Sequence, residues 1–167
     1  MYETPNALLQ TAKDIGAGPD RFRAVGPDRW HQVRDEILQR FTRQRLGNRD
    51  LGWLWEDLAE PSCSYSSDRP LEVIASFAEP RARVWALFED WDRTKRDGAH
   101  WLFEGELAAV LSVVANHHAI EFYVVDRAFG WLAAVNHHDV VMGVGEHAVQ
   151  KIRAAEAAQT ERPEKLE

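Results

Sequence analysis

Three short apolar segments in the C-terminal third of the chain constrain its fold most. They are residues 120–126 (IEFYVVD), 131–136 (WLAAVN) and 140–144 (VVMGV), and only a few turn residues separate them. Runs of this length, rich in valine and aromatic residues, are typical of β-strands. Two such strands joined by a short turn form a hairpin. The pattern therefore predicts an antiparallel sheet in this part of the chain.

The remaining elements are predicted from periodicity and turn residues. Further strands are expected over residues 22–25, 71–77, 83–89 and 100–103, and helices over residues 6–15, 27–46, 106–115 and 146–157. Residues 60–70 (EPSCSYSSDRP) have the composition of a loop, and residues 51–58 fit either a short helix or a strand. We expect an α+β fold with an antiparallel sheet of about five or six strands, N-terminal helices, an inserted helix and a C-terminal helix.

The chain length favours one domain. A chain of 167 residues buries roughly 70% of its unfolded surface, enough for a core without disulfides or metals. We expect a single α+β domain over residues 1–158 and a flexible C-terminal tail over residues 159–167. The sequence shows no apolar run of about 18 residues and no signal-peptide pattern, and its one cysteine is Cys63. These features indicate a cytoplasmic protein without membrane contact.

Acidic residues are concentrated in the middle of the chain. The formal net charge is −7, and residues 51–126 contain fourteen Asp or Glu against six Lys or Arg. Such a surface repels nucleic acid and suits a basic partner. The arginines of the helix predicted from residue 27 lie mostly off its apolar stripe, where they form a solvated face more often than a phosphate-binding one.

Tryptophan is unusually frequent in this sequence, with seven copies, and three of them lie beside acidic residues. Tryptophans contribute strongly to binding hot spots, but they also fill protein cores. The candidate partner-binding residues are Trp53, Trp55, Glu56, Asp57, Asp90, Trp91 and Asp92.

Two histidine pairs flank the predicted hairpin. If the turn centres near Ala128, the register places His118 opposite His138 and His117 near Asp139. Imidazole nitrogens together with a carboxylate suit zinc or another divalent transition metal. The candidate metal ligands are therefore His117, His118, His137, His138 and Asp139.

The same residues have a structural interpretation. The sequence Asn-His-His-Asp at residues 136–139 is also favourable for a turn, in which Asn and Asp bond the backbone and the rings fill polar gaps. No established metal-ligand spacing is present, and no complete set of catalytic groups is recognisable, so no catalytic residue is assigned.

One stretch resembles a known family. Between Trp101 and Gly145, an E-F-Y strand is followed by a turn, by Trp131-Leu132 and by the N-H-H-D sequence. This order resembles the C-terminal signature of a small bacterial family of unknown function. The resemblance implies a bacterial origin and a compact α+β domain, but it implies no activity and no catalytic residue.

Two hypotheses for the function follow. The first is a non-enzymatic protein-binding module, such as an immunity or antitoxin-type protein, that binds a basic partner such as a toxin through its acidic, tryptophan-rich surface and needs no cofactor. The second is a metal-binding protein or metal-dependent hydrolase built on the paired histidines. The first is preferred because charge segregation and aromatic residues are present, whereas a catalytic set is not. The oligomeric state stays open.

Overall fold

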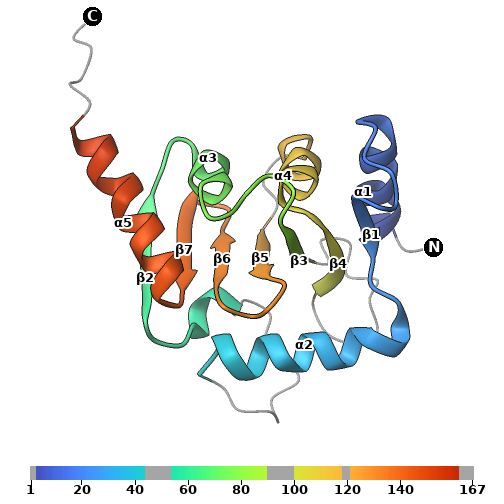
Figure 1. Cartoon of the computed structure of the whole chain (residues 1–167), viewed down its shortest axis with the longest axis horizontal. Helices are drawn as coiled ribbons and strands as arrows, with labels where there is room; N and C mark the ends of the chain where they lie inside the picture. Colours follow the sequence, from blue (N-terminus) through green and yellow to red (C-terminus); the bar gives the residue numbers. More distant parts are fainter. Residues whose placement is uncertain (1–2, 44–53, 90–99, 118–120, 162–167) are drawn as a thin grey trace, which may run out of the picture.

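A seven-stranded antiparallel sheet forms the middle layer of the computed structural model, which describes residues 3–43, 54–89, 100–117 and 121–161 (Figure 1). Within the described residues, the strand order is β1-β4-β3-β5-β6-β7-β2. The strands are β1 (Phe22–Ala24), β2 (Ser62–Ser66), β3 (Arg83–Glu89), β4 (His100–Glu106), β5 (Phe122–Asp126), β6 (Leu132–Val135) and β7 (Val140–Val144). The prediction of an α+β fold with an antiparallel sheet is confirmed, with seven strands instead of five or six.

The predicted hairpin is present as β5 and β6. Phe122 pairs with Val135 and Tyr123 with Ala134, so the register differs by one residue from that of a turn centred on Ala128. Such a one-residue shift decides which face each side chain joins, because side chains alternate along a strand. Because successive side chains point to opposite faces, Phe122 and Tyr123 lie in different cores on the two faces of the sheet.

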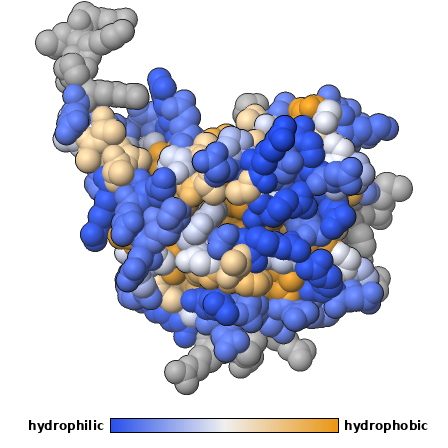
Figure 2. Space-filling view, viewed as in Figure 1, coloured by the Kyte–Doolittle hydropathy of each residue, from blue (hydrophilic) through white to orange (hydrophobic). Residues whose placement is uncertain are grey.

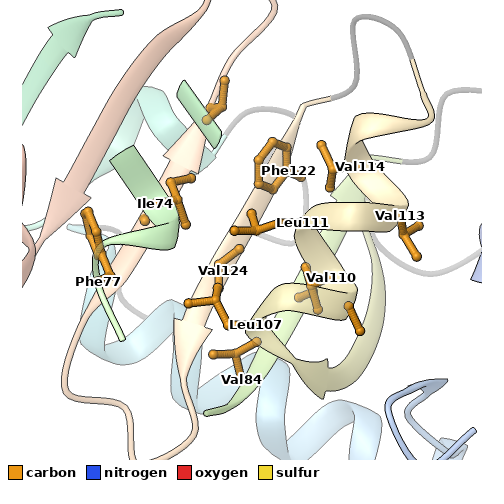
Figure 3. Packing of buried hydrophobic residues seen from close by; sticks show 14 of the residues in the cluster. Ile74, Phe77, Val84, Leu107, Val110, Leu111, Val113, Val114, Phe122 and Val124 are labelled. Atoms are coloured by element: carbon orange, nitrogen blue, oxygen red, sulfur yellow. The ribbon is translucent and has the colours of Figure 1, made fainter. Parts of the chain in front are cut away.

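Four helices cover one face of the sheet. They are α1 (Glu3–Asp14), α3 (Pro70–Ala75), α4 (Leu107–Ala115) and α5 (Glu146–Thr160). Helix α4 packs beside β3 and β5, and its apolar side chains meet Val84, Phe122 and Val124 of those strands (Figure 3). Helix α4 is buried on most sides, as its continuous apolar sequence predicts.

Helix α2 (Pro27–Phe41) and the short 3₁₀ helix η1 (Leu54–Asp57) cover the opposite face. Val33, Ile37 and Phe41 form the buried stripe of α2, and Trp85 and Leu87 of β3 lie in the same core. Because both faces are covered, the central strands are apolar on both sides, which explains their nearly continuous apolar runs.

The strand predicted over residues 71–77 is wrong, because these residues belong mainly to α3. Pro70 occupies the first turn of a helix, where its missing N–H is harmless. Val73 and Ile74 of α3 are buried, and so is Phe77 just beyond the end of the helix. A short apolar run does not distinguish a buried strand from a buried helix turn.

The loop predicted over residues 60–70 is also wrong for its first half. Residues 62–66 form β2, an edge strand that pairs with β7. Its side chains are half-buried or exposed, so its polar sequence resembles that of a loop. Cys63, which lies on this strand, is half-buried, and burial raises the pKa of its thiol.

The boundaries of the predicted helices differ by one to three residues in α1, α4 and α5, and by more in α2. Helix α2 ends at Phe41, earlier than the predicted Leu46, because Thr42 leaves the helix to form a β-bridge with Leu58. The undecided segment at residues 51–58 contains η1. The C-terminal helix α5 extends to Thr160.

The surface shown in Figure 2 is mainly hydrophilic, with smaller hydrophobic areas between. Across the described ranges, none of the helices combines the length and the apolar character needed to span a membrane.

Candidate binding pocket at one end of the sheet

A pocket of about 550 Å³ lies where β5 begins and β6 ends. Four parts of the chain contribute its walls: residues around the start of α3, the end of α4, Phe122 of β5, and the end of β6 with the turn that follows it. The lining residues include Asp68, Arg69, Glu72, His117, Asn136, His137 and Asp139.

The turn between β6 and β7 is held by Asn136. Its buried side-chain oxygen accepts hydrogen bonds from the backbone N–H groups of His138 (2.9 Å) and Val140 (3.2 Å). Asp139 has a φ of +57°, the left-handed conformation that Asp and Asn adopt more readily than most residues. The proposed turn role of this sequence is therefore present, and it fixes where His137 and Asp139 lie.

His137 lies within hydrogen-bond distance of a buried carboxylate. Its Nδ1 lies 2.5 Å from Oε1 of Glu121, whose side chain is only 4% exposed. The indole N–H of Trp55 donates to the other oxygen of Glu121 at 3.3 Å. The backbone N–H of Trp55 donates to the hydroxyl of Tyr123 at 3.2 Å, and burial raises the pKa of that hydroxyl above its usual value. These contacts link η1 to the start of β5 and to the β6–β7 turn.

The other two described histidines of the pairs have different surroundings. Nε2 of His117 lies 2.9 Å from the hydroxyl of Thr11 in α1, and burial lowers the pKa of His117. The ring of His138 lies against that of His137, with centroids 3.9 Å apart.

Three exposed carboxylates surround the pocket, and one guanidinium accompanies them. Asp68, Glu72 and Asp139 are exposed, and Arg69 lies 3.4 Å from Glu72 in an exposed ion pair. Gln159 of α5 donates to Asp68 at 3.5 Å, a long hydrogen bond. The formal charge of these four ionised side chains is −2, so the pocket attracts cations.

The predicted metal ligands are only partly brought together. His117, His137 and Asp139 line this one pocket, whereas His138 is not among its lining residues and His118 lies outside the described residues. In the part of the chain that the structure describes, no group of three or more His, Cys, Asp or Glu side chains is arranged to hold a metal ion.

The predicted partner-binding residues are described only in part. Trp55 is half-buried against the α2-side core, Glu56 is exposed and Asp57 is half-buried. The other four, Trp53, Asp90, Trp91 and Asp92, lie outside the described residues.

Sequence reasoning did not identify Asp68, Arg69, Glu72 or Glu121 as members of a site. The first three reach the pocket only through the folding of α3 against the sheet, which a local pattern does not reveal. Glu121 has a recognisable sequence signal, because a carboxylate between apolar residues is expected to be paired when it is buried.

Residues 6–156 match a family described as "Family of unknown function (DUF6756)". The chain belongs to this family. The match covers nearly all of the sheet and its helices, a much larger part than the segment that carried the resemblance. No curated protein was found to match the sequence. No solved structure was found to match it either.

Proposed function

We propose that this family member is a non-enzymatic binding protein for a basic protein partner, and that the pocket receives a cationic side chain of that partner. The observation that carries the proposal is the set of three exposed carboxylates, Asp68, Glu72 and Asp139, around one concave site. The guanidinium of Arg69 is paired with Glu72 and offsets only part of their charge.

The pocket has suitable dimensions for this role. Its volume of about 550 Å³ exceeds what one long side chain needs, and it lies in the range of ordinary ligand sites. Carboxylates bind guanidinium groups through paired, charge-assisted hydrogen bonds, which favours arginine over lysine. Acidic residues around a concave surface also accelerate the approach of a basic partner.

An immunity protein that neutralises a basic toxin is one kind of protein that fits this description. The size and acidic charge of this chain, and its lack of a recognisable catalytic set, agree with such a role. This suggestion rests on analogy with small acidic binding proteins in general.

The experiment uses a short arginine–glycine peptide with blocked termini and isothermal titration calorimetry at two salt concentrations. The test variant combines Asp68→Asn, Glu72→Gln and Asp139→Asn, and asparagine preserves the tolerance for positive φ at residue 139. The matched control combines Glu79→Gln, Glu156→Gln and Glu161→Gln, three exposed acids outside the pocket lining.

We expect the test variant to bind the peptide about tenfold more weakly than the control, with a weaker salt dependence. Equal affinity of the two variants, or no binding to the unmodified protein, contradicts the proposal.

A second candidate function is divalent metal binding at the same pocket. The observation in its favour is that His117, His137 and Asp139 all line it. Elemental mass spectrometry of protein purified without chelator tests this candidate. Near-stoichiometric zinc, manganese, iron or nickel that is lost in His137→Ala supports metal binding, whereas the same low content in both proteins counts against it.

A further inference from the structure

A cluster of arginines lies at the end of the strands opposite the pocket. Trp85 of β3 pairs with Glu104 of β4 and with Val125, near the far end of β5, whereas the pocket lies at the Phe122 end. Three guanidinium groups converge here on the carboxylate of Glu104. They come from β1, the first turn of α2 and the β5–β6 turn: Arg23, Arg29 and Arg127.

Among the described residues, the carboxylate of Glu104 lies within ion-pair distance of all three cations. Nε of Arg23 donates to Oε1 of Glu104 at 2.9 Å, and Nη1 of Arg127 donates to Oε2. Nη1 of Arg29 lies 3.9 Å from Oε1, beyond hydrogen-bond distance. The group of four side chains has a formal charge of +2. The Glu104 side chain is 5% exposed, whereas the arginine side chains are 37–51% exposed and accessible to a ligand.

The buried ring of Trp85 lies beneath two of these arginines. The guanidinium carbons of Arg127 and Arg29 lie 3.7 and 5.3 Å from its ring centroid. Its indole N–H is buried and has no hydrogen-bond partner among the described residues, which is costly for a polar group. The cluster therefore contains many N–H donors and few acceptors.

We propose that Arg23, Arg29 and Arg127, two of which pack on the ring of Trp85, form a binding site for a dianionic phosphoryl group, either inorganic phosphate or the monoester of a small molecule. A phosphoryl group supplies several acceptor oxygens and two negative charges, which match the excess of donors and the charge of +2. The location of Arg29 in the first turn of α2 adds the favourable field of a helix N-terminus. The ring face of Trp85 is occupied by Arg127, which favours an oxyanion over a stacking base.

The experiment follows the indole N–H signals by two-dimensional NMR while inorganic phosphate, glycerol 3-phosphate or sodium chloride is added at equal ionic strength. Trp85→Phe assigns the relevant signal. Arg29→Gln is the test variant, because Arg29 donates no hydrogen bond to Glu104 and its loss leaves the Glu104 contacts to Arg23 and Arg127 in place. Arg34→Gln is the matched control, since Arg34 lies on the same helix and contacts Asp35 and Trp30 instead.

We expect a saturable shift of the Trp85 signal with phosphate, and about tenfold weaker binding in Arg29→Gln with little change in Arg34→Gln. Tighter binding of glycerol 3-phosphate than of phosphate indicates a phosphorylated small molecule, and equal binding indicates the inorganic ion. The proposal is overturned if sodium chloride produces the same shifts as phosphate, or if the two arginine variants weaken binding equally.

Discussion

Glu121 shows how a single buried carboxylate ties the candidate site together. It accepts a hydrogen bond from the indole of Trp55 and lies within hydrogen-bond distance of His137, although it directly precedes the apolar strand β5. A buried charge that loses a partner is destabilising, since its desolvation is no longer compensated. The contacts of Glu121 therefore explain how the β6–β7 turn is held against η1.

Replacing Glu121 by Gln is expected to lower the free energy of unfolding by about 1–2 kcal/mol, because the charge-assisted contacts become neutral ones. His137→Gln is expected to cost less than about 1 kcal/mol, since its side chain is 45% exposed and screened by water. Urea denaturation of both variants measures the two values. A larger loss of unfolding free energy in His137→Gln than in Glu121→Gln would contradict the view that Glu121 is the more important of the two residues for stability.

Glu104 gives the protein a predictable response to acid. Burial raises the pKa of this carboxyl group, but hydrogen bonds from Arg23 and Arg127 outweigh burial and hold it below its usual value. The resulting stabilisation is complete above the unfolded pKa, near 4.5, and is lost as pH falls through the lower folded pKa.

Glu104→Gln is accordingly expected to cost about 2 kcal/mol at neutral pH, because two arginines lose their charged acceptor. Its stability should then fall less steeply than that of the unmodified protein below about pH 4.5. Thermal or urea unfolding from pH 7 to pH 3 measures both effects. Parallel stability curves for the two proteins would show that Glu104 does not respond to acid as described.

At the scale of elements, the contact between α5 and β7 depends on the absence of a side chain. A Cβ atom at Gly143 would lie 2.7 Å from Cδ1 of Ile152 and 2.9 Å from Cβ of Ala148, both on α5. Gly143→Ala is expected to cost about 1–3 kcal/mol, because the helix must move away from the sheet. Gly18→Ala is the control, since a Cβ there meets no atom within 4 Å. Chemical denaturation measures both, and equal effects would contradict the close packing.

Helices and strands with long apolar patterns are predictable from the sequence. Those whose secondary structure depends on packing against other segments are not. The runs that form β3, β5, β6 and β7 were recognised because both of their faces are buried. Strand β2 was missed because it lies at the sheet edge with polar side chains, and α3 because its apolar run is too short to show a helical period. The turn that contains His137 is predictable from its sequence. Its contact with Glu121, and the position of Asp68 and Glu72 around the pocket, depend on how distant segments pack together.

At the scale of the whole molecule, opposite charges lie at opposite ends of the strands. Acidic side chains surround the pocket near Phe122, and arginines surround Glu104 near the other end of the sheet. This arrangement would allow the proposed basic partner and the proposed phosphoryl ligand to bind at separate sites. Salt is expected to weaken both kinds of binding, since exposed charges are screened over about 8–10 Å at physiological ionic strength. Calorimetric titrations of the arginine–glycine peptide and of phosphate at two salt concentrations measure this. Affinities that do not change with salt would contradict the electrostatic account of both sites.

The central claim, that a basic partner uses the acidic pocket, is tested most directly by mapping where an arginine side chain binds. The measurement is a titration of ¹⁵N-labelled protein with arginine methyl ester, followed by backbone amide shifts. The account predicts saturable shifts confined to residues around Asp68, Glu72 and Asp139, which vanish in the triple charge variant. Shifts that are scattered over other surfaces, or that persist unchanged in that variant, would contradict it.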